Sequence, residues 1–169
     1  MFIEIDDARI FTVAFGPPTA PALLGIGGWI GSWELWALPF SALSANWRTI
    51  SYDHRGSGAT FAPSASIIFA RLVDDVFGVM DAYGVQRCYL AAESAGAATA
   101  LAAALKRPER IAGLVIVDGY YFGDTPNERD PFLTGLRTHY AATLDAFVAA
   151  CVPEKNCDPI KRWGRQILD

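Results

Sequence analysis

One serine stands where a hydrophobic run gives way to a run of small residues. Ser94 follows the apolar segment 88–92 and precedes an alanine-rich segment, with small residues two places away on either side at Ala92 and Gly96. This spacing is typical of a sharp strand-to-helix turn that lifts the hydroxyl out of a sheet. The first N–H groups of a helix over about 95–105 would then face developing negative charge. The pattern favours acyl transfer; a simple helix N-cap is the alternative.

The composition is that of one soluble globular domain. The 169 residues are 52% hydrophobic and 19% charged, with a net charge of -4 and no run of Lys or Arg. That charge pattern argues against nucleic-acid partners and against binding to an acidic membrane. The sequence contains no apolar stretch near the ~20 residues of a membrane span, and it opens without a basic leader. We therefore expect a cytoplasmic protein.

The three cysteines lack the paired spacing of a zinc site. Cys88 lies in an apolar run, while Cys151 and Cys157 flank a short polar segment. We expect thiols at all three positions, with a disulfide between the last two as the alternative. The sequence thus predicts neither a metal nor a cofactor.

Apolar runs alternate with segments of helical periodicity along the first two thirds of the chain. We expect strands at 2–5, 9–15, 22–26, 47–52, in the run before Ser94 and at 111–117, with helices at 32–43, 66–83 and 95–105. Pro39 is expected to break the first helix, and Gly84 to end the second. Alternation of this kind predicts an α/β fold with a doubly wound, mostly parallel sheet, preceded by a hairpin at the sheet edge.

Three strand-end motifs resemble those of the α/β-hydrolase superfamily. Ala92-Glu-Ser-Ala-Gly96 resembles its nucleophile elbow, Gly27-Gly-Trp-Ile-Gly-Ser32 its His-Gly-x-x-Gly-Ser loop, and Asp53-His-Arg-Gly-Ser-Gly58 its Asp-x-Arg-Gly-x-Gly turn. The segment Leu114–Gly119 is similar to the strand after the elbow. The resemblance implies the fold of that superfamily.

The resemblance also implies an oxyanion hole around Ser94. Its two donors would be the backbone N–H groups of Trp29 and Ala95, supported by Gly27, Gly28 and Gly96. Two such donors are worth roughly 3 kcal/mol each in a transition state. Gly27 stands where the family usually has histidine.

The other members of a catalytic triad are harder to assign. In the superfamily the acid and the histidine follow the serine along the chain, and Asp118 is a candidate acid, with a loop-capping carboxylate as the alternative. We expect His54 to be a turn or rim histidine and His139 a partly exposed helix histidine rather than bases for Ser94. Glu93 is expected to face the pocket or the lid.

Other side chains near these motifs are given structural roles. We expect Asp53 and Arg55 to form an ion pair and cap their turn. Tryptophans at 29, 33 and 36 are interpreted as core residues, with the wall of an acyl pocket as the alternative.

The chain divides into a core at 1–123 and the start of a helical lid at 124–169. Apolar residues recur with helical spacing at 131–150 and 158–168. Because the resemblance places the catalytic histidine beyond the lid, we expect an incomplete chain that is inactive by itself. The strand at 111–117 would then form an exposed sheet edge through which the chain self-associates.

We interpret the sequence as that of a serine hydrolase acting on an ester or related acyl bond of a small molecule. A catalytically inactive binding protein on the same fold is the first alternative, because a fold alone does not give a function. A Rossmann-type nucleotide binder is the second, suggested by the glycines at 25–31, although their spacing departs from the usual pattern.

Overall fold

The computed structural model describes residues 1–121 and 130–168. The chain forms two compact units, Met1–Tyr121 and Phe122–Asp169. The predicted boundary between core and lid lies among residues 122–129, outside the described part. Among the described helices, none has both the length and the apolar character needed to cross a bilayer.

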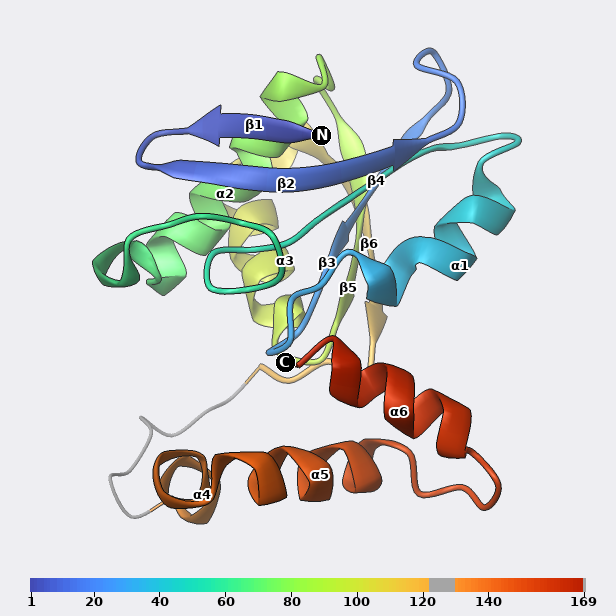
Figure 1. Cartoon of the computed structure of the whole chain (residues 1–169). Helices are drawn as coiled ribbons and strands as arrows, with labels where there is room; N and C mark the ends of the chain where they lie inside the picture. The colour runs from blue at the N-terminus through green and yellow to red at the C-terminus, as the bar shows by residue number, and fades with distance from the viewer. Residues whose placement is uncertain (122–129, 169) are drawn as a thin grey trace. The chain divides into compact units, whose positions relative to one another are not determined.

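An open six-stranded sheet runs through the first unit (Figure 1). Its order is β1-β2-β4-β3-β5-β6; β1 pairs with β2 and β2 with β4 antiparallel, whereas β4, β3, β5 and β6 are parallel. The predicted hairpin and parallel sheet are thereby confirmed. The bounds are β1 Phe2–Ile5, β2 Ala8–Phe15, β3 Ala22–Ile26, β4 Arg48–Tyr52, β5 Cys88–Glu93 and β6 Ile111–Val117.

Helices cover both faces of this sheet, as a doubly wound fold requires. Helix α1 (Glu34–Leu43) lies on one face, and α2 (Phe69–Ala82) and α3 (Gly96–Lys106) lie on the other (Figure 1). Short 3₁₀ turns occupy Ser64–Ser66 and Pro108–Arg110.

Successive side chains of β3 point to opposite faces and so divide the core into two layers. Leu24 and Ile26 belong to the larger cluster, beneath α2 and α3, whereas Leu23 packs with Trp36 and Phe40 of α1. The larger cluster also contains Ile10, Ile50, Val76, Met80, Leu90 and Ala100.

Two helix predictions need correction. Pro39 does not break α1, which continues to Leu43; it only removes one N–H from the ladder of a ten-residue helix. Helix α2 begins at Phe69, because Ile68 has an extended backbone with φ -131°. Gly84 follows the end of α2 with φ +67°, as predicted, and its N–H donates to Asp81 O at 3.0 Å.

Arg55 does not form the expected ion pair with Asp53. Its guanidinium is fully buried and donates from Nε and Nη2 to both carboxylate oxygens of Asp75, at 2.7 and 3.0 Å. Nη1 donates to Asp7 at 2.5 Å and to Ser66 Oγ at 2.9 Å. Arg55 therefore fastens the β1–β2 turn to α2, because a buried guanidinium needs several acceptors.

The described part of the second unit, residues 130–168, contains three helices: α4 (Pro131–Thr138), α5 (Tyr140–Cys151) and α6 (Asp158–Gln166). The single helix predicted at 131–150 is interrupted at His139, where φ is -142°. At this break the chain changes direction, and α5 packs against α4 with the rings of Phe132 and Phe147 5.5 Å apart. Arg165 of α6 donates to Asp145 of α5 at 2.9 Å. The role of a lid stays a prediction.

Candidate active site

Ser94 occupies the sharp turn between β5 and α3. Its φ of +48° lies in the left-handed region, which costs a residue other than glycine about 1–3 kcal/mol. Its N–H donates to Val117 O at 3.1 Å, and its carbonyl accepts from Tyr120 N at 3.0 Å. The chain at the end of β6 therefore holds the strained turn. Strain of this kind is concentrated at functional sites.

Glycine at 96 lets the start of α3 approach the loop after β3. A Cβ at Gly96 would lie 2.5 Å from Gly27 O and 2.9 Å from Ile26 O. Any larger residue would push the helix away from that loop. The structure thus explains the small residue two places after Ser94 by close packing.

The glycine loop lies directly against the elbow. A Cβ at Gly28 would be 2.9 Å from the Cβ of Ser94 and 2.6 Å from Glu93 Oε1. The N–H of Gly28 donates to Glu93 Oε1, with 2.6 Å between nitrogen and oxygen. The carboxylate of Glu93 thus fixes the backbone of the neighbouring loop, because an N–H beside a carboxylate forms a strong, charge-assisted bond. The expectation that Glu93 faces the pocket or the lid stays a prediction.

The two predicted oxyanion donors flank Ser94 along these loops. Ala95 follows Ser94 directly and is exposed. Trp29 follows Gly28, and its side chain is 45% exposed. Their backbone N–H groups belong to the elbow and to the loop that contacts it, so the fold brings together the segments that the sequence analysis paired. Their role as donors stays a prediction.

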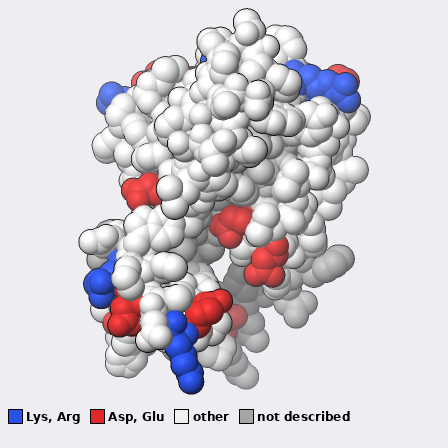
Figure 2. All heavy atoms as spheres, turned by 90° about the vertical axis from the view of Figure 1, so that its right-hand side faces the viewer, with Lys and Arg blue, Asp and Glu red and all other residues white. Residues whose placement is uncertain are grey.

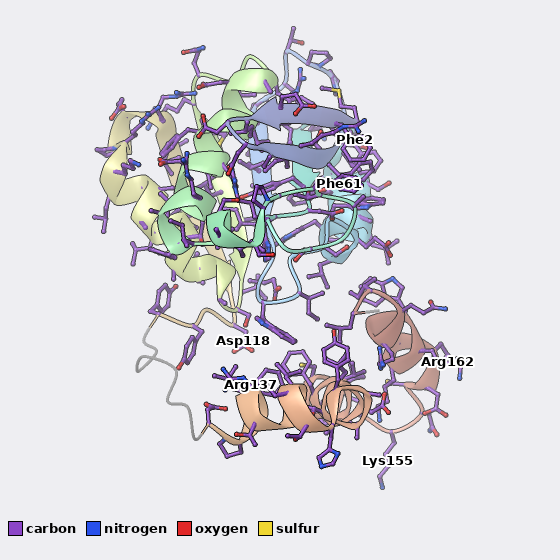
Figure 3. The ribbon with its side chains drawn as sticks, turned by 60° about the vertical axis from the view of Figure 1, so that its left-hand side comes forward. Phe2, Phe61, Asp118, Arg137, Lys155 and Arg162 are labelled. Atoms are coloured by element: carbon purple, nitrogen blue, oxygen red, sulfur yellow. The ribbon has the colours of Figure 1, made fainter. Side chains whose placement is uncertain are left out.

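Asp118 lies at the carboxyl end of β6, beside the strand that carries Ser94 (Figure 3). It is exposed and has φ +47°. Within residues 1–121, the hydrogen bonds of Ser94 involve its backbone atoms, not Asp118. Its assignment as the triad acid stays a prediction.

The ring of His54 faces the glycine loop. Nε2 lies 2.9 Å from Gly28 O, while Nδ1 lies 2.9 Å from Arg55 O and 3.2 Å from Ser57 Oγ. Strand β3 separates β4, which His54 follows, from β5, which precedes Ser94. His54 is thus a turn histidine with both nitrogens engaged, and not a base oriented toward Ser94. His139 is exposed at the junction of α4 and α5 rather than within a helix.

Asp53 supports the same loop from β4. Its buried carboxylate accepts from Trp33 N at 2.8 Å and from Ala59 N at 2.9 Å, so it caps its turn as expected. Burial raises the pKa of Asp53, and these hydrogen bonds oppose the rise. The anchoring roles of His54 and Glu93 were missed by the sequence analysis. The one available signal was that both residues stand at strand ends within matched motifs.

The tryptophans do not form one group. Trp36 is buried against Leu23 and Phe40 in the core, as the core interpretation expects. Trp33 is half-buried, with its ring edge-on to Phe11 at 6.4 Å. Trp29 alone among the three is exposed.

The geometry gives no support to a nucleotide-binding loop. The N–H of Gly28 already donates to a carboxylate, which would repel a pyrophosphate. Gly25 lies beneath the rings of Trp36 and Phe40 rather than beside open space.

Cys88, Cys151 and Cys157 are thiols, so the alternative disulfide is not formed. Among residues 1–121 and 130–168, no group of three or more His, Cys, Asp and Glu side chains is placed to hold a metal ion.

An open, mostly parallel sheet with helices on both faces and a left-handed residue between strand and helix defines the α/β class with a strand-turn-helix elbow. Residues 21–161 match the sequence model of the alpha/beta hydrolase fold family. The chain therefore belongs to the α/β-hydrolase family.

Relatives and solved structures agree with this assignment. The chain is 35% identical over 127 residues to a Caulobacter vibrioides protein provisionally named carbamate hydrolase RutD, covering 75% of this chain and 46% of that protein. The chain spans about half the length of the curated relatives it matches.

Two crystal structures show the same fold. A hydrolase from Pseudomonas aeruginosa superimposes with a TM-score of 0.87 at 24% identity, covering 99% of this chain and 66% of that one. The enol-lactonase from Burkholderia xenovorans gives 0.85 at 21% identity, covering 99% and 67%.

Proposed function

We propose that this protein hydrolyses an ester or related acyl bond of a small molecule, with Ser94 as the nucleophile. The observation that carries the proposal is the strained backbone of Ser94 at the start of α3, with the Gly28 loop against its side chain. A strained turn that presents a hydroxyl beside two backbone loops is the arrangement that acyl transfer needs.

In the proposed reaction, Ser94 Oγ attacks the carbonyl carbon while its proton passes to a base. The N–H groups of Trp29 and Ala95 stabilise the oxyanion that forms. Collapse expels an alcohol or amine, which takes up the proton, and leaves an acyl ester on Ser94. Water then attacks this ester and releases the acid.

We expect the 169-residue chain alone to react slowly. The hydrogen bonds of Ser94 within residues 1–121 come from its backbone, so no base among these residues holds its hydroxyl. A serine without a base keeps only the residual catalysis of its oxyanion hole and binding groups.

Substrates related to those of the relatives form the first panel to test. The related Caulobacter protein is named as a carbamate hydrolase and a structural neighbour as an enol-lactonase. A carbamate and a lactone both present a carbonyl that a serine can attack. We propose small carbamates, esters and lactones as the substrate class.

A fluorophosphonate probe with added imidazole tests the role of Ser94. Imidazole supplies the base from solution, so the yield of adduct in intact-mass spectra should rise with imidazole concentration. The adduct should map to Ser94 and disappear in Ser94→Ala. Equal adduct in wild type and Ser94→Ala, or none at any imidazole concentration, would contradict the nucleophile and favour a binding protein on this fold.

A further inference from the structure

The side chain of His54 holds one peptide unit of the glycine loop. Its Nε2 lies 2.9 Å from Gly28 O. That carbonyl shares a planar peptide unit with the N–H of Trp29, and in a trans peptide the two groups point in opposite directions. The structure has no cis peptide bonds among the described residues. The N–H of Trp29 therefore points to the side of the loop away from His54.

The same histidine contacts the loop at a second place. Its ring lies against Gly31, where an added Cβ would be 2.1 Å from Nε2, and Gly31 has φ +61°. The backbone N–H of His54 donates to Gly31 O at 3.2 Å. A glycine at 31 is needed both for this backbone conformation and for the space that the imidazole occupies.

Glu93 holds the loop from the elbow side. Its carboxylate accepts from Gly28 N, one peptide unit before the carbonyl that His54 holds. Consecutive peptide units are thus fixed by two side chains, one at the end of β5 and the other just after β4. A peptide held in this way cannot rotate without breaking one of the two hydrogen bonds.

The bond to Gly28 O requires a proton on Nε2, because a carbonyl oxygen can only accept. In the neutral ring, Nδ1 can then accept from the hydroxyl of Ser57 at 3.2 Å. The other neutral tautomer, with its proton on Nδ1, would instead donate to Arg55 O at 2.9 Å. Holding Gly28 O therefore depends on the tautomer with its proton on Nε2.

We propose that His54 is a positioning residue for acyl hydrolysis: by holding Gly28 O, it aims the N–H of Trp29 at the oxyanion. This inference rests on the function proposed for Ser94. His54 does not touch the reacting atoms; it acts through one peptide unit. Pre-oriented donors stabilise an oxyanion without reorganising during the reaction.

Two substitutions test the hydrogen-bond donor and the ring of His54 separately. His54→Gln keeps an N–H that can reach Gly28 O, whereas His54→Phe keeps a flat ring without a donor. With the fluorophosphonate probe and imidazole, we expect the maximal labelling rate of Ser94 to fall about 10- to 100-fold in His54→Phe. The probe concentration at half-maximal rate should change less than about twofold, and His54→Gln should recover most of the rate.

Measurements without catalysis test the same proposal independently of Ser94. Nitrogen-15 spectra of the histidines should show a protonated Nε2 at His54. Hydrogen exchange at the Trp29 amide should change at least about tenfold in His54→Phe but little in His54→Gln. Thermal unfolding identifies a variant that fails to fold, and in that case His54→Leu replaces His54→Phe.

The outcomes separate this proposal from the proposed function. If wild type shows no Ser94 adduct but the Trp29 amide responds to His54→Phe, the function fails and the positioning of the peptide stands. If Ser94 is labelled equally in wild type and His54→Phe while the Trp29 amide is unchanged, the positioning proposal is wrong.

Discussion

Strands β3 and β6 have similar sequences and opposite surroundings. Both are continuous apolar runs, Ala22–Ile26 and Ile111–Val117. Every residue of β3 is buried, because the strand lies between β4 and β5 and beneath helices on both faces. In β6, by contrast, Val115 and Val117 are each 52% exposed. An apolar run thus indicates a strand without indicating its place in the sheet.

Exposed apolar side chains occur on both β6 and α1. Figure 2 shows mostly uncharged atoms on the side of the first unit that includes α1. Leu38 of α1 and Leu114 and Val115 of β6 are among the exposed apolar side chains of this unit. Exposed apolar surface beside a strand that pairs on one side favours contact with another chain.

The largest difference between the two strands should appear in stability. Leu24→Ala, at a side chain that is 1% exposed, should lower the free energy of unfolding by about 2–5 kcal/mol through lost burial and a cavity. Leu114→Ala, where the side chain is 37% exposed, should cost about 1 kcal/mol or less. Urea unfolding followed by circular dichroism measures both. Equal losses would show that exposure does not distinguish the strands.

The thiol of Cys88, on strand β5 between β3 and β6, reports whether β6 separates from β5. Cys88 pairs with Ile111, and burial raises the pKa of its thiol from 9.0 to about 12. At pH 8 it should carry roughly 1000-fold less thiolate than an ordinary cysteine. Iodoacetamide should therefore label Cys151 long before Cys88.

The matched variants Ile111→Ala in β6 and Leu23→Ala in β3 sharpen this measurement. If β6 is the looser strand, Ile111→Ala should accelerate labelling of Cys88 by opening the β5–β6 pair locally. Leu23→Ala should act only through global unfolding. If the labelling rate of Cys88 rose in both variants only in proportion to their loss of unfolding free energy, local opening would be contradicted.

Association through the exposed strand β6 should raise the mass of the particles that the protein forms in solution. We propose that chains associate through β6, so that light scattering coupled to size exclusion gives a mass above the 18.3 kDa of one chain. Val115→Lys should reduce the mass, because a charge on an edge strand opposes pairing. Phe61→Lys, beside β1 at the opposite edge of the sheet and at a residue that is 66% exposed, is the control and should leave the mass unchanged. A monodisperse wild-type monomer would contradict association.

The smallest effect is expected at the opposite edge of the sheet, where β1 is held by charge. The hydrogen bond from Arg55 lowers the pKa of Asp7, with burial opposing it. Charged Asp7 therefore adds stability above its unfolded pKa of about 3.9, and this stability is lost as pH falls through the lower folded pKa.

Asp7→Asn tests this edge. The variant should be less stable than wild type near pH 7, and the difference should shrink below about pH 4. Thermal unfolding across this pH range measures the difference. A stability difference that stays constant at low pH would mean that shape, and not charge, carries the contact between Asp7 and Arg55.

Aromatic rings also contact each other at this edge of the sheet. The rings of Phe2 and Phe61 have centroids 6.4 Å apart (Figure 3).

The sequence by itself determined the order of strands and helices, the elbow at Ser94 and the family. These follow from local patterns: apolar periodicity, small residues around a sharp turn, and glycines at strand ends. The runs at 2–5, 22–26 and 111–117 became strands with the predicted bounds. Local chemistry sufficed because each pattern acts within a few residues.

Only the tertiary structure decided which side chains meet. Arg55 pairs with Asp75 across 20 residues, Glu93 bonds to Gly28 across 65, and His54 faces Gly28 across 26. Nothing in the spacing of these residues specifies such contacts, because they depend on the order of strands in the sheet. The same order buried β3 and left β6 exposed, since burial depends on neighbours that an apolar run does not identify.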